Sequence, residues 1–182
     1  MKTLILLRHA KSSWNDAVAR DFDRPLNKRG RRAARAVGEA MRAQGLEWDR
    51  VVASPATRVV ETLADLAEGY GQPIRADFDE RIYLASVTTL LEVIHEADEG
   101  ADRLLVVGHN PGLENVALML TDGERRNRLR DELSTKYPTG TVAEIAFPVD
   151  CWSEVERGTG KLRKFIRPRD LDPQLGPEPE DR

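Results

Sequence analysis

The sequence lacks several features that would place it in a large class of proteins. Its single cysteine, Cys151, cannot form a disulfide within the chain and has no cysteine or histidine neighbour at the spacing of a zinc site. No apolar stretch approaches the roughly 20 residues that span a bilayer. These absences argue against a disulfide scaffold and a membrane protein, so we expect a cytoplasmic protein with no membrane partner.

The chain also lacks an excess of basic residues. Its formal net charge is −3 with 32% charged residues, which argues against general nucleic-acid binding. The 182 residues are 40% hydrophobic, which is enough for one core, and we predict a single domain over residues 1–167. Residues 168–182 contain four prolines and no apolar periodicity, so we expect an exposed, flexible tail with no catalytic role.

Strand-like and helix-like patterns alternate along the chain. Four apolar segments are predicted to be strands, and the first three are continuously apolar, as buried parallel strands usually are: Thr3–Leu7, Arg50–Ala53, Leu104–Val107 and Val142–Phe147. The helical patterns cover Lys28–Gln44, Pro55–Tyr70, Val87–Ala97 and a segment that begins at Pro111. This alternation predicts an α/β fold, a three-layer α/β/α sandwich with a mainly parallel central sheet.

The pattern changes after about residue 140. The stretches "TVAEIAF" and "GKLRKFIRP" alternate between apolar and polar residues and are separated by a turn at Gly158–Gly160. We expect them to be late strands at one edge of the sheet, where antiparallel pairing is allowed.

Arginine and histidine side chains follow three of the predicted strands. Arg8 and His9 end the first strand, "SPATR" brings Arg58 after the second, and "VVGHNPG" brings His109 after the third. Ser54 of "SPATR" is a candidate helix N-cap. Because ligands of open α/β sheets bind beyond the carboxyl ends of the strands, we expect these four side chains to converge there, beside helix N-termini that favour anions.

Two guanidinium groups and two imidazoles in one place are suited to phosphoryl chemistry. The planar fork of arginine matches phosphate oxygens and can stabilise charge during transfer. A neutral imidazole can attack phosphorus in line and form a phosphohistidine that water later hydrolyses. We interpret His9 as this nucleophile and His109 as a protonated donor to the phosphoryl oxygens, although spacing alone does not assign the two roles.

The segments "LRHAKSSWN", "SPATR" and "VVGHNPG" resemble, in this order, the histidine phosphatase superfamily, in the branch that includes phosphoglycerate mutases. The short chain and its opening most resemble SixA-type phosphohistidine phosphatases. The resemblance covers roughly residues 1–120. It implies that His9 is phosphorylated, that Arg8, Arg58 and His109 complete the phosphate pocket, and that neither a metal nor a cofactor is required. It also suggests substrate contacts from Ser12 and Asn15, which can equally be ordinary turn residues.

Two positions depart from the family pattern. The common Arg-His-Gly motif has Ala10 in its third position here, which adds one methyl group. Mutase-like members supply a glutamate as general acid, and the candidate here lies in "ADFDERIY", where Glu80 is favoured and Asp79 is the alternative. A phosphohistidine substrate would need no such acid, because its leaving nitrogen can be protonated directly.

Three functions remain open at this stage. The first is a phosphatase that acts through a phosphohistidine on His9, with a phosphorylated small molecule or a phosphoprotein, including phosphohistidine proteins, as its partner. The second is a phosphoglycerate mutase-type phosphotransferase, which would need a lid that excludes water. The third is a phosphate-binding module without turnover. The basic runs at 28–35 and 125–130 are either solvated helix faces or a means of attracting acidic partners. The oligomeric state cannot be read from these patterns.

Overall fold

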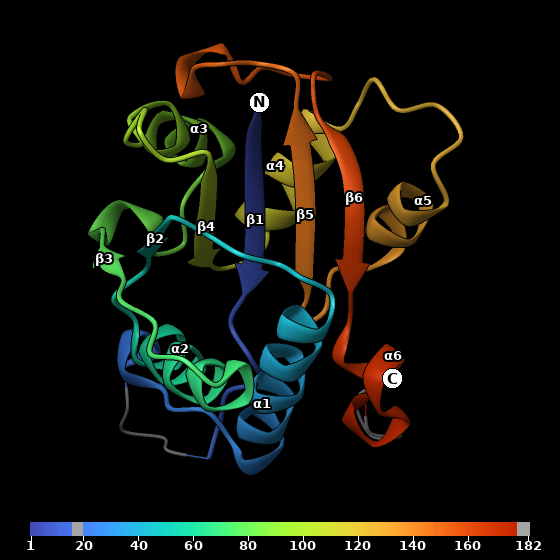
Figure 1. Ribbon diagram of the computed structural model, residues 1–182. Coiled ribbons are helices and arrows are strands. Elements are labelled where there is room, and N and C mark those ends of the chain that lie inside the picture. Colours follow the sequence, from blue (N-terminus) through green and yellow to red (C-terminus); the bar gives the residue numbers. More distant parts are fainter. Residues whose placement is uncertain (16–19, 178–182) are drawn as a thin grey trace.

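The computed structural model describes residues 1–15 and 20–177, which form one six-stranded sheet with helices on both faces (Figure 1). The strand order is β3-β2-β4-β1-β5-β6. The strands are β1 Lys2–Arg8, β2 Arg50–Ala53, β3 Asp77–Phe78, β4 Arg103–Gly108, β5 Val142–Phe147 and β6 Lys161–Ile166. The helices are α1 Lys28–Ala43, α2 Thr57–Tyr70, α3 Val87–His95, α4 Gly112–Leu120, α5 Arg128–Thr135 and α6 Pro168–Leu171. The predicted α/β fold class is confirmed.

The sheet is parallel over four strands and antiparallel at one side. β1 pairs in parallel with β4, β4 with β2, and β2 with β3, whereas β5 pairs antiparallel with both β1 and β6. β2 and β5 have the bounds expected from the sequence, and β1 and β4 extend one residue further at each end. The sequence analysis missed β3 because its two residues are both exposed and carry no apolar pattern.

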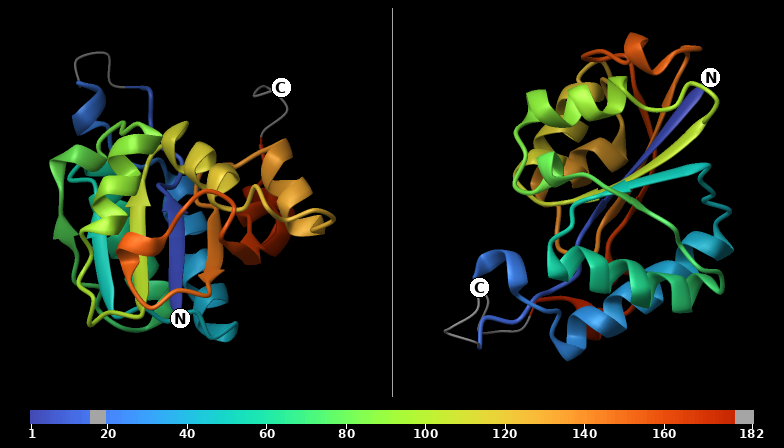
Figure 2. Two further views of the ribbon diagram at one scale, coloured as in Figure 1. Left: turned by 90° about the horizontal axis from the view of Figure 1, so that it is seen from above. Right: turned by 90° about the vertical axis from the view of Figure 1, so that its left-hand side faces the viewer.

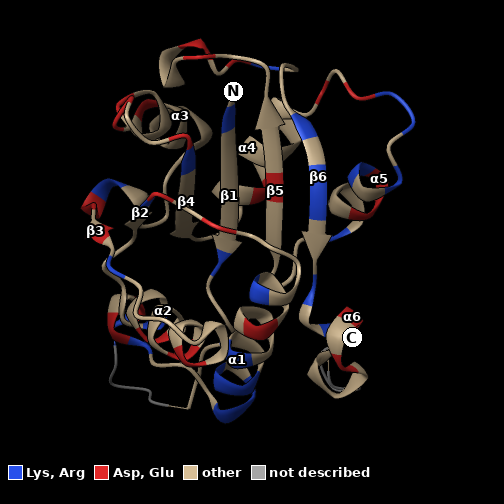
Figure 3. Ribbon diagram, in the orientation of Figure 1, with Lys and Arg blue, Asp and Glu red and all other residues tan. Residues whose placement is uncertain are grey.

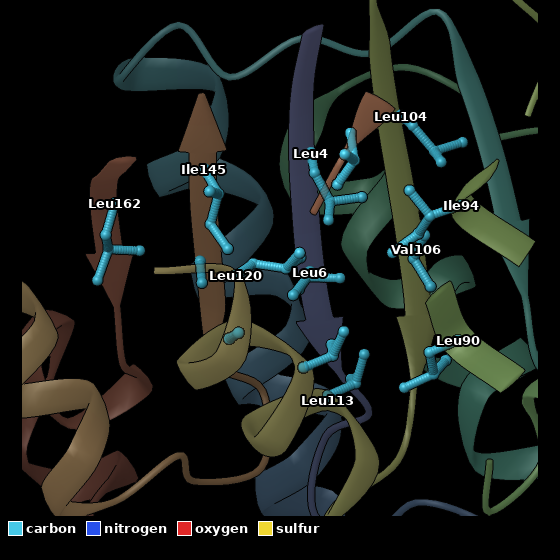
Figure 4. Packing of buried hydrophobic residues seen from close by; sticks show 14 of the residues in the cluster. Leu4, Leu6, Leu90, Ile94, Leu104, Val106, Leu113, Leu120, Ile145 and Leu162 are labelled. Atoms are coloured by element: carbon cyan, nitrogen blue, oxygen red, sulfur yellow. The ribbon is translucent and has the colours of Figure 1, made fainter. Parts of the chain in front are cut away.

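The side chains of β1 alternate between two apolar layers. Ile5 and Leu7 face the layer formed with α1 and α2, whereas Leu4 and Leu6 face the layer formed with α3, α4 and α5. Figure 2 shows these helices on opposite sides of the sheet, and Figure 4 shows the second layer, where Leu6 lies beside Leu113 of α4. All four of these β1 side chains are at most 1% exposed, so β1 is buried on both faces. Its carboxyl end is therefore held rigidly.

Helices α1 and α2 pack closely because glycines lie where they cross. A Cβ atom built on Gly38 of α1 would lie 2.3 Å from the carbonyl oxygen of Leu66 and 2.8 Å from the backbone nitrogen of Tyr70, both on α2. Real Cβ atoms do not approach backbone atoms so closely, so a side chain here must push the two helices apart.

Gly38→Ala is therefore expected to destabilise the protein, even though alanine has the higher helix propensity. We expect the free energy of unfolding to fall by roughly 2 kcal/mol, since overpacking exceeds the gain in propensity. Urea denaturation followed by circular dichroism measures this change. Glu39→Ala, at an exposed position of the same helix, is the matched control and should change the stability by less than about 0.5 kcal/mol. Equal stabilities of the two variants would contradict the close packing.

No helix in the part of the chain that the structure describes is both long enough and apolar enough to cross a membrane.

The segment after β6 differs from the expected flexible tail. Residues 168–171 form α6, and residues 173–175 form a 3₁₀ turn. Pro168 is buried, and α6 packs against α1. Residues 178–182 of the expected tail lie outside the described residues. Figure 1 shows α6 beyond the end of β6, on the side toward which β1 points.

Candidate active site

Arg8 is the last residue of β1, and its guanidinium group is held by a hydrogen bond to the loop before β5. Its Nη1 donates to the carbonyl oxygen of Tyr137 at 2.9 Å, and the buried Tyr137 hydroxyl donates to the carbonyl oxygen of Leu6 at 2.6 Å. The Nε of Arg8 is buried and has no hydrogen-bond partner among the described residues. A half-buried guanidinium with an unpaired donor that lines the cavity is suited to bind an anion.

His9 follows directly and is 7% exposed. Its Nδ1 lies 2.7 Å from the carbonyl oxygen of Ala10. A carbonyl can only accept, so Nδ1 carries the proton and Nε2 keeps its lone pair. The Nε of Arg58 lies 3.4 Å from this Nε2 and donates toward it. Burial, reinforced by the nearby cationic side chains and His109, lowers the pKa of His9 to about 3. The ring is therefore neutral near pH 7, as a nucleophile must be.

Arg58 is the second residue of α2 and is 2% exposed. Its Nη1 donates to the backbone carbonyl of Asp21 at 2.7 Å, and its Nη2 donates to the Asp21 carboxylate at 3.1 Å. Nη2 also donates to Nδ1 of His109 at 3.2 Å. All three guanidinium nitrogens thus hold partners, which fixes the plane of the group between the two histidines.

The expected role of Ser54 as a helix cap is wrong. Helix α2 begins at Thr57, and its N-cap residue is Ala56. The Ser54 hydroxyl accepts from the backbone nitrogen of Ala56 at 3.3 Å and lies 2.8 Å from Nε2 of His109. Ser54 therefore orients a histidine, and the helix starts two residues later than its capping signal suggested.

His109 follows β4, is 4% exposed, and lies opposite His9 with 5.3 Å between the ring centroids. Because an arginine N–H can only donate, the contact with Arg58 places the lone pair on Nδ1 and the proton on Nε2, toward Ser54. Burial, and then the charge of Arg58, lower the pKa of His109 to about 4. The structure therefore favours a neutral His109 in place of the protonated ring expected from the sequence, since desolvation and the charges of Arg58, Arg8 and Arg24 oppose the second proton.

These two pKa values predict that neither ring takes up a proton between about pH 8 and pH 5, whereas an ordinary histidine titrates near 6.5. NMR titration of the imidazole resonances measures this directly. Since the unfolded chain binds protons below about pH 6.5 and the folded rings do not, stability should fall as the pH drops from 6.5 toward 3. A midpoint near 6.5 for either ring would contradict the lowering of its pKa by burial.

Sequence analysis did not identify Asp21 and Tyr83, which complete the site. The Tyr83 hydroxyl donates to the Asp21 carboxylate at 2.5 Å, and Nε of Arg24 donates to the other carboxylate oxygen at 3.1 Å. The hydrogen bond from Tyr83, followed by the charge of Arg58 and the hydrogen bonds from Arg58 and Arg24, lowers the pKa of Asp21 to about 2. Asp21 is therefore an ionised clamp for Arg58. The sequence signal was present in "RDFDRP", but nothing local links this segment to the strand ends.

Neither candidate for the general acid lines the cavity at the histidines. Glu80 is exposed and does not line the cavity at the histidines. Asp79 accepts hydrogen bonds from Arg81, whose charge lowers its pKa, and it borders a separate surface hollow beside β3. The 3₁₀ turn Glu80–Ile82 carries these acids at the outer edge of the sheet and turns Tyr83 and Leu84 toward the site instead.

The structure also places Ser12, Asn15 and Ala10, the three positions of the segment after β1 that were singled out in the sequence. Ser12 is 7% exposed and lines the cavity, whereas Asn15 is exposed and does not line it, so the structure gives no support to a contact from Asn15. The methyl group of Ala10 is buried with Leu26 and Ala34, and the backbone nitrogen of Ala10 donates to the hydroxyl of Thr62 at 3.0 Å. The added methyl thus packs behind the loop and does not narrow the site.

The four side chains predicted from the strand ends line one cavity of about 480 Å³. Within the described residues, the other walls come from the segment after β1, the start of α1, the loop before β5 and the segment 168–177. Asp21 is the only carboxylate among these described lining residues. No group of three or more histidine, cysteine, aspartate or glutamate side chains within residues 1–15 and 20–177 is arranged to hold a metal ion.

Comparison with known proteins gives a consistent assignment. The model of the histidine phosphatase superfamily (branch 1) matches residues 4–143. Over 164 residues the chain is 37% identical to an uncharacterized protein from Mycobacterium tuberculosis, which covers 90% of this chain and 100% of that protein. A candidate phosphohistidine phosphatase SixA from Nakamurella multipartitia has a TM-score of 0.78 and 29% identity, covering 92% of this chain and 96% of that one. A SixA candidate from Agrobacterium tumefaciens has a TM-score of 0.75 and 25% identity, covering 91% and 97%. The chain belongs to the histidine phosphatase superfamily, branch 1, and is SixA-like in fold.

Proposed function

We propose that this protein is a phosphatase that removes a phosphoryl group through a covalent phosphohistidine on His9. Membership of the superfamily supports phosphatase activity. The observation that carries the covalent route is the state of the His9 ring, which is neutral and has its Nε2 lone pair in the cavity between Arg8, Arg58 and His109. A phosphate-binding module would have no use for a nucleophile in this position.

In the first step, Nε2 of His9 attacks phosphorus and the bond to the leaving group breaks. The N–P bond that forms places positive charge on the imidazole, and the hydrogen bond from Nδ1 to the Ala10 carbonyl stabilises that charge. Arg8 and Arg58 neutralise the equatorial phosphoryl oxygens as charge develops on them. The negative phosphoryl group also raises the pKa of His109 from its low value, so the ring can donate to an oxygen.

In the second step, water attacks phosphorus, the N–P bond breaks, and inorganic phosphate leaves while His9 returns to its neutral state. Hydrolysis is favoured over transfer within a sugar acid because water can reach the cavity. Leu84 and Trp14, which line the cavity, are 55% and 76% exposed, so no lid formed by residues 1–15 or 20–177 covers either of them. The SixA candidates of similar fold support phosphohistidine in a protein as one substrate.

The covalent route is tested with para-nitrophenyl phosphate and with a ³²P-labelled phosphoester. We expect turnover of the first without added metal, and acid-labile, base-stable label on the chain when the second reaction is quenched within one turnover. Turnover without any trapped label would exclude the phosphohistidine. Binding of phosphate without turnover would support the module instead.

The position of Glu80 leads to a separate expectation. Glu80→Gln should change kcat and KM for para-nitrophenyl phosphate by less than about twofold, because this side chain is exposed and away from the cavity. Steady-state kinetics measured from pH 5 to pH 9 would reveal an acid if there were one. A loss of the alkaline limb of the pH profile, or a tenfold fall in kcat, would restore Glu80 as the general acid.

A further inference from the structure

The cavity is larger than its four converging side chains require. Its volume of about 480 Å³ lies within the range of roughly 300–1,000 Å³ that is typical of sites for whole small molecules. A phosphoryl group held between Arg8, Arg58 and the histidines fills only one end. The remaining space must hold the leaving group, so the residues that line it determine which leaving groups can bind.

Those walls are strongly cationic. Seven lysine and arginine side chains line the cavity within the described residues, against the single carboxylate of Asp21: Arg8, Lys11, Arg24, Arg29, Arg58, Lys136 and Arg169. Asp21 is shared between Arg24 and Arg58, each at 3.1 Å, so it does not offset the others. Such an excess in a chain of net charge −3 is local. Figure 3 shows lysine and arginine gathered over the first turns of α1, where Arg29 of the basic run 28–35 lies.

Lys136 and Arg169 stand out among these seven. Neither forms an ion pair or a side-chain hydrogen bond with any of the described residues, although both line the cavity. Arg8 and Arg58, by contrast, are held by the hydrogen bonds already described and lie at the histidines. Two cations on the wall of the cavity that have no carboxylate partner among the described residues are suited to a second anion.

The segment that carries Arg169 is anchored in place. Arg167 pairs with Asp170 at 2.7 Å and with Glu132 of α5 at 3.6 Å, and the next residue, Pro168, is buried. A Cβ atom built on Gly140 would lie 3.0 Å from the Pro168 ring, which shows how closely α6 contacts the loop before β5. Lys136 lies at the start of that same loop. The two cations therefore come from contacting segments, and Arg169 lies beyond the residues matched by the superfamily model.

We propose that Lys136 and Arg169 form a second anion subsite, and that the natural substrate carries a second phosphate or carboxylate in its leaving group. This inference rests on the proposed function, because the first anion is the phosphoryl group transferred to His9. The second anion is either part of a small phosphorylated molecule or an acidic side chain near a phosphorylated residue. In both cases the two cations select the leaving group and take no part in bond breaking.

Binding is measured by calorimetry on a chain in which His9→Ala prevents turnover, with two pairs of ligands. Fructose 1,6-bisphosphate is compared with fructose 6-phosphate, and a phosphoserine peptide flanked by aspartates is compared with the same peptide flanked by asparagines. We expect at least one pair to show a preference of about tenfold or more in Kd for the more anionic member. The pair that shows it identifies the source of the second anion.

The subsite is then removed. Lys136→Ala combined with Arg169→Ala should reduce that preference to less than about threefold, whereas Lys161→Ala, an exposed lysine on β6 outside the cavity, should leave it intact. Melting temperatures and circular dichroism show whether the double variant is folded, and Arg169→Lys, which keeps the charge, should retain most of the preference. Raising the salt from 50 mM to 500 mM should weaken the preference in the unaltered subsite.

Equal Kd values within both ligand pairs would overturn the subsite, as would a folded double variant that keeps the full preference. The proposed function is judged separately, by turnover of para-nitrophenyl phosphate in the chain with His9 present. A chain that shows the preference but no turnover would retain the subsite and lose the proposed phosphatase activity. A chain that shows turnover but no preference would do the reverse.

Discussion

Replacing His9 by alanine is expected to lower kcat for para-nitrophenyl phosphate by roughly 10⁴-fold and to abolish the acid-labile label. The expected loss is large because the variant removes the atom that forms the covalent bond and leaves only the anion-binding groups. Arg8 and His109 keep their hydrogen-bond partners, and Arg58 keeps its contacts with Asp21 and His109, so inorganic phosphate should still bind. Single-turnover kinetics and phosphate binding, measured on the same preparation, separate the lost chemistry from any loss of structure.

The control for this experiment is the third histidine of the chain. His95 lies on α3, where its Nε2 is 2.8 Å from the carbonyl oxygen of Val155, far from the cavity wall. His95→Gln should change kcat by less than about twofold. Exogenous imidazole, which the cavity is large enough to admit, should restore part of the rate of the His9 variant. If the variant kept a tenth of the original rate, His109 or water would have to be the nucleophile.

The parts of the site that could be predicted from sequence are those that follow buried strands. Arg8 and His9 follow the apolar run of β1, and His109 follows that of β4, and parallel strands bring such ends to the same edge of a sheet. Once the buried strands are identified in the sequence, the approximate positions of these three side chains follow. No loop conformation has to be known.

Asp21 and Glu80 show why the remainder could not be predicted. Asp21 lies in a segment without an apolar pattern, and it reaches Arg58 because the 3₁₀ turn Asp21–Asp23 packs against α2. Glu80 was the residue favoured as the general acid, but it lies in a 3₁₀ turn that exposes its side chain. The same turn places Tyr83 in contact with Asp21. Short turns change the direction of a side chain within one or two residues, and hydrophobic periodicity does not record this.

The segment 168–177 was misjudged for a different reason. Its prolines and charges are typical of a flexible tail, and the sequence contains no periodic pattern there. It is ordered through the buried Pro168 and through the ion pair between Arg167 and Glu132, which are contacts with residues distant in the sequence. A short segment can thus be fixed by a few tertiary contacts even though its own composition predicts disorder.

The second large effect is expected at Arg58, where charge and shape can be separated. Arg58→Lys keeps the positive charge but has one nitrogen in place of the three that contact His9, Asp21 and His109. We expect kcat/KM for para-nitrophenyl phosphate to fall by about 10²- to 10³-fold. Most of the loss should be in kcat, because the lost contacts orient the rings and the equatorial oxygens, whereas the charge that attracts the substrate remains.

Arg31→Lys is the matched control, since Arg31 on α1 is an arginine that pairs with Glu61 and Asp65 and does not line the cavity. It should alter kcat/KM by less than about twofold. NMR of the His109 ring gives a second readout, because in the Arg58 variant Nδ1 loses its donor. The pKa of the ring should then rise above about 4, while burial and the retained charge keep it below its ordinary value. A fall of less than tenfold in kcat/KM, with the His109 pKa unchanged, would mean that charge alone suffices. The planar fork that holds both histidines would then have no role in the reaction.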